Sequence, residues 1–336
     1  MPVPPTVVIF RLGSLGDTVV ALPCFHAVAR RYPDHRRVVL TNAPVAEEAP
    51  PLLAVLGDHG LVHGAIAYPA GLRRPGDLFD LARRLRSLNA TDLIYLSPPR
   101  GPGSLERDWL FFKACGFARI LGLPRGSDLA RCRIDAGTGE VEREASRLIR
   151  TLHPATGAID LDAPANWDLG LTKLERAVAT TILDPLSQRR FVAVHMGGKG
   201  PGKDWGEANW TALARSLSAQ RSDTALVILG AASDRPRAQT LAAAWEGPAL
   251  DICGRLTPRE SAAVLERACL FIGHDSGPLH LAAIGGAPTL GMFGPRTRPR
   301  QWHPVGPRVR ILHNLESLDK ITVADVAAAA EDMMTR

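Results

Sequence analysis

Short runs of apolar residues alternate along the chain with segments of helix length. The first run, residues 6–10, is rich in β-branched apolar residues, and a helical pattern follows it at about 18–31. Runs of this kind are typical of parallel strands that are buried on both faces. The alternation continues with strands expected at 37–41, 64–68, 92–97 and 119–123 and helices at 76–88 and 106–115. Such βαβ repetition predicts a doubly wound parallel sheet.

A second series of strands follows a segment in which the apolar runs stop. Between about 135 and 168, Gly and Pro gather around an expected helix at 140–152. Further strands are then expected at 191–196, 225–230, 249–253, 269–273 and 289–293, with a closing helix at 323–334. Because single cores stop growing at roughly 250 to 300 residues, the 336-residue chain predicts two domains. We expect an α/β fold of two tandem Rossmann-like domains, 1–170 and 171–336, with the last helix able to pack back on the first domain.

The composition excludes several classes of protein. The chain is 46% hydrophobic and 22% charged, as globular proteins are, and no stretch approaches the roughly 18 to 20 apolar residues that a membrane span needs. The amino terminus lacks the basic start and apolar core of a signal peptide, so we expect a cytoplasmic protein. The five cysteines are scattered and never spaced as CxxC, which indicates neither a disulfide framework nor a zinc knuckle.

The net charge is +6, without a basic tail or arm. Arginines concentrate between residues 73 and 133, where they form either an ordinary solvated helix face or a surface for a phosphate-bearing lipid or glycan. Aromatic residues make up only 5% of the chain and do not interleave with the basic ones. We therefore expect no nucleic-acid partner.

Ligands of doubly wound sheets bind beyond the carboxyl ends of the strands, so the loops that follow apolar runs are the candidate binding loops. The first such loop runs from Arg11 to Asp17, and its Gly13 and Gly16 permit a tight turn. Asp17 falls near a helix N-terminus, where the dipole favours an ionised carboxylate that can take a proton from a hydroxyl. A plain helix-capping role fits Asp17 equally well. The spacing GxxGD differs from GxGxxG and gives little support for NAD binding.

The second loop is glycine-rich and ends in a lysine. Residues 197–203 fit GxxxxGK, but Asp204 stands where a Walker A loop needs Ser or Thr, and Pro201 lacks an amide donor. An NTPase is therefore disfavoured. Gly197, Gly198 and Lys203 still suit a phosphate, with Lys203 as a point charge on a leaving diphosphate.

The third loop follows the strand expected at 225–230 and carries Ser233 and Asp234. A carboxylate one short loop beyond a Rossmann strand is well placed to accept hydrogen bonds from ribose hydroxyls. Capping of the next helix by either residue is an equally good interpretation.

The fourth loop follows the strand expected at 269–273. Its Asp275, Ser276 and Gly277 open a helix whose N-terminus can bind an anion. Polar residues this dense between an apolar strand and a helix are hard to explain by packing alone. His280, one turn into the helix, is either a ligand or a structural histidine.

Three other motifs carry less weight. Asp160-Leu161-Asp162 has the form of a DxD metal motif but lies in the Gly- and Pro-rich segment and not at a strand end, so no metal is expected. The histidines show no HExxH spacing. Ser14 and Ser276 lack the G-x-S-x-G context of an α/β-hydrolase.

The four loops, in this order on two tandem Rossmann-like domains, resemble glycosyltransferase family 9, the heptosyltransferases of lipopolysaccharide core assembly. The 11–17 loop resembles the family's N-terminal Gly-Asp loop, and Lys203-Asp204-Trp205 with Trp210 resembles its K-x-W…W segment. Residues 275–283 (DSGPLHLAA) and 293–295 (FGP) are close to its DSGPxHLAA…FGP signature. The resemblance spans residues 6 to about 304.

The resemblance implies a GT-B fold, with acceptor bound by the first domain, nucleotide sugar by the second, and reaction in the cleft between them. It implies inverting, metal-independent transfer in one displacement, with Asp17 as general base and Lys203 stabilising the diphosphate. The acceptor-binding residues implied are Arg11, Gly13, Ser14 and Gly16. The donor-binding residues implied are Gly197, Gly198, Lys203, Asp234, Asp275, Ser276, Gly277 and His280.

The resemblance also implies the substrates. The family's usual donor is ADP-L-glycero-β-D-manno-heptose, and its acceptor is a Kdo-lipid A or heptosylated core on the inner face of the inner membrane. The arginines between 73 and 133 would suit such a phosphorylated glycolipid and a peripheral contact with the membrane. No cofactor beyond the nucleotide sugar is implied.

The chain departs from the family pattern at two places. His274 precedes the DSG triplet where a small or polar residue is common, and residues 296–299 (RTRP) replace the usual GPTDP continuation. Arg296 and Arg298 therefore stand beside the expected donor pocket. Three alternatives stay open at this point: a glycosyltransferase with another donor sugar, a nucleotide-sugar epimerase or NAD-linked oxidoreductase on the same scaffold, and a non-catalytic nucleotide- or glycan-binding protein.

Overall fold

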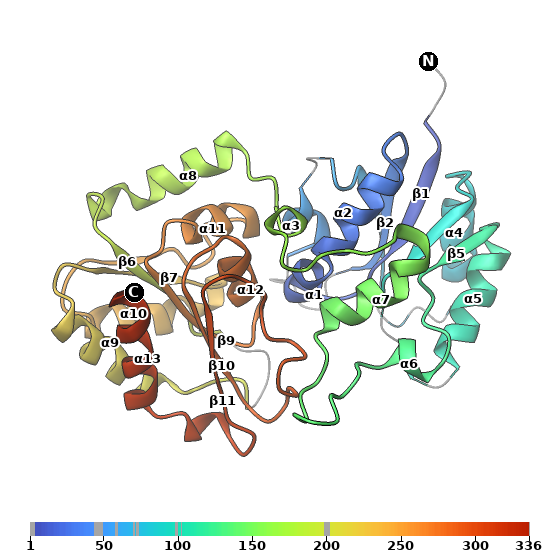
Figure 1. Cartoon of the computed structure of the whole chain (residues 1–336). Coiled ribbons are helices and arrows are strands. Elements are labelled where there is room, and N and C mark those ends of the chain that lie inside the picture. The colour runs from blue at the N-terminus through green and yellow to red at the C-terminus, as the bar shows by residue number, and fades with distance from the viewer. Residues whose placement is uncertain are drawn as a thin grey trace. The chain divides into compact units, whose positions relative to one another are not determined.

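The computed structural model describes residues 4–43, 50–57, 60–69, 71, 74–97, 100–101, 103–197 and 202–335. The chain divides into two units, Met1–Leu169 and Gly170–Arg336, and each unit is a parallel sheet covered by helices (Figure 1). This is the α/β architecture of two Rossmann-like domains that the alternation of apolar runs predicts. Within the described ranges, no helix combines the length and the apolar character that crossing a membrane requires.

The first unit has five parallel strands in the order β3-β2-β1-β4-β5. Their bounds are Thr6–Phe10 (β1), Arg36–Asn42 (β2), Gly64–Tyr68 (β3), Asp92–Tyr95 (β4) and Arg119–Leu121 (β5). The helices are Leu15–Val20 (α1), Leu22–Arg31 (α2), Leu52–Leu56 (α3), Pro75–Arg86 (α4), Ser104–Ala114 (α5), Ser127–Ala130 (α6) and Glu144–Thr156 (α7), with a 3-10 turn at Pro164–Asn166. The central strand β1 is buried at every position, as an apolar strand covered on both faces must be.

The segment expected as one helix at 18–31 is two helices, α1 and α2, which meet at Ala21. Pro23 lies in the first turn of α2, where its missing N–H costs nothing, but the same residue cannot continue α1 with a bond to Val19. The break leaves α1 only 6 residues long, and α1 begins at Leu15. As a result, Asp17 lies in the first turn of α1.

The segment without strands belongs to the first unit. Its helix α7 begins four residues later than the expected 140 and ends at Thr156; the next residue, Gly157, has a φ of +76°, which favours glycine. One face of α7 packs against α2. This contact holds the residues up to Leu169 on the first sheet.

The second unit has six parallel strands in the order β11-β10-β9-β6-β7-β8. Their bounds are Phe191–His195 (β6), Ala225–Leu229 (β7), Ala249–Asp251 (β8), Leu270–His274 (β9), Thr289–Phe293 (β10) and Val309–His313 (β11). The helices are Lys173–Leu183 (α8), Glu207–Gln220 (α9), Arg235–Ala244 (α10), Pro258–Leu265 (α11), Gly277–Ile284 (α12) and Val323–Thr335 (α13). Short 3-10 turns occur at Asp184–Leu186, Ala232–Asp234 and Leu318–Lys320.

One strand of the second unit differs from the expectations. Strand β11 was not expected, because it is only partly buried and lacks an apolar run. Helix α13, whose packing the sequence left open, packs on α9 and β9 of its own unit.

The strand order determines which loops meet. In the second unit β6 lies between β9 and β7, and all three strands are parallel, so their carboxyl ends share one edge of the sheet. The order reverses between β6 and β9, and in the first unit it reverses between β1 and β4. Ligands of open α/β sheets bind at such switch points.

Candidate active site

In the first unit, the loop after β1 folds around the Asp17 carboxylate. The Ser14 backbone N–H and the Ser14 hydroxyl both donate to Asp17 Oδ2, at 2.8 and 3.0 Å. Asp17 thus caps α1, as one of the two interpretations of its position predicts. Its side chain is still 32% exposed, so capping does not remove Asp17 from solvent.

Gly13 makes this fold possible. Its φ is +130°, and a β-carbon at this position would lie only 2.4 Å from the Asp17 Cβ. The Gly13 backbone N–H donates to Asn42 Oδ1 at the end of β2, at 2.9 Å. Gly13 is exposed, and Ser14 and Gly16 are half-buried, so this part of the loop can be reached from solvent.

Arg11 supports the loop from beneath. Its side chain is 1% exposed, and its guanidinium donates to the carbonyls of Leu96 and Asp17, at 2.6 and 2.5 Å. Burial lowers the pKa of Arg11 below its usual value, and the Asp17 carboxylate opposes that shift at 3.9 Å. Arg11 therefore holds the loop in place, and its expected role in acceptor binding stays a prediction.

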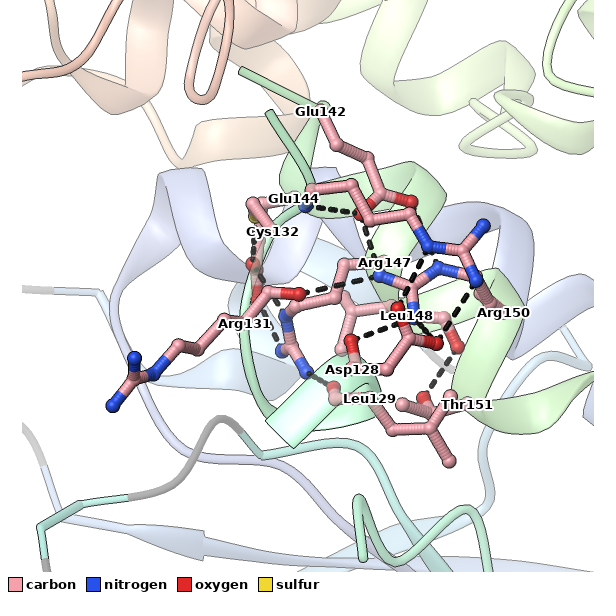
Figure 2. Close-up of polar contacts among 11 residues, drawn as sticks. Asp128, Leu129, Arg131, Cys132, Glu142, Glu144, Arg147, Leu148, Arg150 and Thr151 are labelled. Atoms are coloured by element: carbon pink, nitrogen blue, oxygen red, sulfur yellow. Dashed lines mark hydrogen bonds and ion pairs between the residues drawn. The ribbon is translucent and has the colours of Figure 1, made fainter. Parts of the chain in front are cut away.

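A buried ion pair on α7, between Glu144 and Arg147, affects the pKa of Arg11. Arg147 donates to both oxygens of Glu144, at 2.8 and 2.5 Å, and to the Leu129 carbonyl at 3.1 Å (Figure 2). Both side chains of the pair are at most 3% exposed. Glu144 favours the charged form of Arg11 and Arg147 opposes it.

In the second unit, Lys203 meets the first residue of the fourth loop. Lys203 Nζ donates to Asp275 Oδ2 at 2.7 Å, and the Thr297 hydroxyl donates to the same oxygen at 2.6 Å. Lys203 comes from the loop after β6, Asp275 follows β9, and Thr297 lies in the loop after β10. The structure therefore brings two of the expected donor residues together and adds Thr297, which was not expected.

A second group of polar residues surrounds His195 at the end of β6. The Ser276 hydroxyl lies 3.2 Å from His195 Nδ1 and donates to the His274 carbonyl at 3.1 Å. Burial lowers the pKa of His195 to about 4, although the Asp234 carboxylate opposes the shift. His195 is therefore neutral near pH 7.

Asp234 belongs to the same group, because Gly197 lies close to both the His195 ring and the Asp234 carboxylate. A β-carbon at Gly197 would lie 3.0 Å from the His195 ring and 3.3 Å from Asp234 Oδ2. The Ala231 N–H donates to that same Oδ2 at 2.8 Å, so Asp234 also shapes the turn before α10. Close approach at Gly197 thus joins the loops after β6 and β7.

His274, a departure from the family pattern, lies beneath the loop that contains Trp205. The Trp205 backbone N–H donates to His274 Nε2 at 3.2 Å, and the Trp210 ring packs edge-on against His274 at 5.3 Å between centroids. Burial lowers the pKa of His274 to about 4. Both tryptophans are almost fully buried, and they anchor the end of the Lys203 loop to the core.

The other expected residues are placed as follows. Gly277 is the first residue of α12, and His280 is buried in its second turn. Gly198 lies outside the described residues. The residues that sequence reasoning missed are His195 and Thr297; the only signal for His195 was a polar residue at the end of an apolar strand.

The DxD segment forms a local turn, in which Asp160 accepts the Asp162 N–H at 2.9 Å. No three His, Cys, Asp or Glu side chains converge as potential metal ligands within the described residues.

Comparison with known proteins identifies the class. The model of glycosyltransferase family 9 (heptosyltransferase) matches residues 128–327. Lipopolysaccharide heptosyltransferase 1 of Pseudomonas aeruginosa is 28% identical over 314 residues, which cover 86% of this chain and 78% of that one. Lipopolysaccharide heptosyltransferase 2 of Salmonella typhimurium is 26% identical over 176 residues, about half of each chain.

Among solved structures, E. coli heptosyltransferase WaaC with ADP superimposes with a TM-score of 0.68 over 98% of this chain and 99% of that one, at 17% identity. That likeness concerns the fold. With the two parallel sheets, it defines a protein of the GT-B class. The family model matches more than half of the sequence, and the chain belongs to glycosyltransferase family 9, as its motifs predicted.

Proposed function

We propose that the protein is an inverting, metal-independent heptosyltransferase. It transfers heptose from ADP-L-glycero-β-D-manno-heptose to a lipopolysaccharide core or another cell-surface glycan. Membership of family 9 and the names of the two relatives support the proposal. The single observation that carries it is the meeting of Lys203 with Asp275 at the switch point of the second sheet, where a nucleotide sugar is expected.

The second unit binds the donor in this proposal. Asp234 accepts from the ribose hydroxyls, and Lys203 stabilises the charge that develops on the diphosphate. Asp275, Ser276, Gly277 and His280 hold the sugar and phosphates. The N-terminus of α12 supports this assignment, because the dipole of a helix favours an anion at that end.

The first unit binds the acceptor, and Asp17 is the general base. The acceptor oxygen attacks the anomeric carbon as the bond from that carbon to the diphosphate breaks. Asp17 takes the hydroxyl proton, and ADP leaves with the electron pair of the broken bond. Asp17 Oδ2 already accepts two hydrogen bonds from Ser14, so Oδ1 is the oxygen that receives the proton.

The remaining acceptor-side residues divide into two roles. Gly13, Ser14 and Gly16 contact the acceptor, because they form the part of the loop that solvent reaches. Arg11 keeps the loop in place through its bonds to the carbonyls of Leu96 and Asp17.

The acceptor is a glycolipid, and the protein works at the cytoplasmic face of the inner membrane as a peripheral protein. The outer face of α4 and α5 supports this part of the proposal. Phe79 of α4 and Leu110 of α5 are 64% and 61% exposed, and Arg86 links the two helices by donating to the Ala114 carbonyl at 2.7 Å. Apolar side chains among arginines suit an anionic lipid surface.

The decisive experiment measures ADP release from ADP-heptose with and without a Kdo-lipid A acceptor. We expect release only with acceptor, a product of inverted configuration, and full activity in EDTA. Asp17→Asn should lower the rate about a hundredfold or more while leaving ADP binding intact. Lys203→Ala should lower the rate and, unlike Asp17→Asn, should also weaken ADP binding.

Other outcomes identify the alternatives. Activity with a different nucleotide sugar would retain the glycosyltransferase and reject heptose. Interconversion of a nucleotide sugar without acceptor would indicate an epimerase. Donor binding that never leads to nucleotide release would indicate a non-catalytic binding protein.

A further inference from the structure

A small pocket at the carboxyl edge of the second sheet is lined from three loops. The Lys203 loop contributes Gly202 and Lys203, the end of β9 contributes His274 and Asp275, and the loop after β10 contributes Arg296 and Thr297. The net charge of these side chains therefore determines how strongly the pocket attracts an anionic ligand.

The charge of Lys203 is already compensated. Asp275 Oδ2 accepts from Lys203 Nζ at 2.7 Å, and the side chains are 30% and 15% exposed. The Thr297 hydroxyl donates to the same oxygen and holds the carboxylate against the lysine. Together, the Lys203–Asp275 pair adds no net charge to the pocket.

The histidine in the pocket adds no positive charge either. His274 is buried, and burial lowers its pKa to about 4. It is therefore neutral near pH 7, as its acceptance of the Trp205 N–H through Nε2 also requires.

Among the described residues that line the pocket, Arg296 is the remaining cation. Its side chain packs over Gly202, where a β-carbon would come within 3.2 Å of the Arg296 Nε. Arg296 is exposed, and within the described part of the chain it forms neither an ion pair nor a hydrogen bond. Arg298 is also exposed but does not line the pocket, so only one of the two arginines that depart from the family pattern lies at the site.

We propose that Arg296 is a phosphate-binding residue that determines the affinity of this protein for its nucleoside diphosphate. The inference rests on the proposed donor site and assigns it a residue that the family signature does not contain. The planar guanidinium can donate two parallel hydrogen bonds to phosphate oxygens, a bidentate geometry that the lysine ammonium lacks. It supplies the net positive charge of the pocket while Lys203 is shared with Asp275.

The test compares Arg296→Gln with Arg298→Gln, which removes the same charge two residues away and outside the pocket. Binding of ADP, UDP, GDP and dTDP to the wild-type protein is measured by calorimetry, and the nucleotide that binds best is then used with both variants. We expect Arg296→Gln to weaken this nucleotide about tenfold or more, as the loss of a charge-assisted bond does, and Arg298→Gln to change it less than about twofold. The parent nucleoside, which has no phosphate, should bind all three proteins alike.

Salt provides a second readout. The wild-type affinity should fall more steeply with ionic strength than that of Arg296→Gln, because screening weakens an interaction that the variant lacks. Equal affinities of wild-type protein and Arg296→Gln, or equal losses in the two variants, would overturn the inference and leave the proposed function intact. If none of the four nucleotides binds the wild-type protein, the donor site fails, and the proposed function falls together with the inference.

Discussion

Gly13 lies against the side chain of Asp17. A β-carbon at position 13 would come within 2.4 Å of the Asp17 Cβ and 2.7 Å of its Oδ2. The glycine also adopts a φ of +130°, which other residues rarely tolerate. The carboxylate that we propose as the base can cap α1 only because position 13 has no side chain.

Gly13→Ala should therefore separate acceptor chemistry from donor binding. The methyl group displaces Asp17, so we expect the transfer rate to fall about a hundredfold, as misplacement by about 1 Å does elsewhere. ADP binding should be unchanged. Gly139→Ala is the control, because Gly139 has a φ of +70° with no neighbour within 4 Å. It should share the backbone strain, about 1 to 3 kcal/mol, without the loss of rate.

Thr297→Val removes one hydroxyl and almost no volume. In the variant, Asp275 Oδ2 keeps the hydrogen bond from Lys203 and loses the one from position 297. We expect kcat/KM to fall about tenfold, because the lysine is then positioned less well. The free energy of unfolding should fall by about 1 kcal/mol, the usual worth of a buried hydrogen bond.

The matched control is Thr289→Val. Thr289 is fully buried, and its hydroxyl donates to the Ala287 carbonyl at 2.8 Å, away from the pocket. It should lose similar stability and keep its activity. Equal kcat/KM in the two variants would reject a positioning role for Thr297.

Acid should destabilise the second unit in two separate steps. The pKa of His195 and that of His274 are lowered by burial to about 4, below the usual 6.5, so the folded state favours the neutral rings. That stability is present above pH 6.5 and is lost as the pH falls toward 4, at about 3 kcal/mol for one such histidine. The pKa of the Glu175 carboxylate is lowered to about 2; burial opposes this shift, and the Arg259 side chain outweighs it by hydrogen bonding. Its contribution is lost only between about pH 4.5 and 2.

Urea unfolding at pH 7, 5.5 and 4.5 measures the first step. His195→Asn should show a shallower fall between pH 7 and 4.5 than the wild-type protein, because it lacks one of the groups that must take up a proton. An unchanged slope would show that His195 does not titrate in this window.

The sequence predicted the strands better than the contacts between them. Ten of the strands coincide with apolar runs, and the central strands among them, such as β1, β6 and β9, are buried at every position. Strand β11 was missed, because it is only partly buried and lacks an apolar run. The break between α1 and α2 was also missed, although Pro23 marked it.

The candidate site was predictable as a set of loops but not as a geometry. Lys203 and Asp275 are 72 positions apart, and their meeting depends on β6 lying beside β9, which no local pattern encodes. Thr297 and Arg296 stand beside a recognised motif in the sequence. The structure adds that Thr297 contacts Asp275 and that Arg296 lies against Gly202 in the pocket. Local chemistry was thus readable, and nonlocal pairing was not.

The buried pair Glu144–Arg147 links the stability of the first unit to the Asp17 loop. The pair lies between α6 and α7, where the Cys132 thiol also donates to Glu144 at 3.5 Å (Figure 2). Because Glu144 also favours the charge on Arg11, its carboxylate offsets two buried guanidinium groups. Removing it leaves both with less compensation.

Glu144→Gln should therefore cost about 3 to 5 kcal/mol in the free energy of unfolding, as a broken buried pair does. Asp128→Asn is the control in the same cluster: its side chain is 57% exposed and pairs with Arg133 and Arg150, so its loss should cost less than about 1 kcal/mol. Urea unfolding compares the two, and ADP binding to the second unit should survive in both. Transfer should fall in Glu144→Gln alone, since only that substitution reaches Asp17 through Arg11. Similar small losses in both variants would show that the buried pair neither stabilises the first unit nor supports its loop.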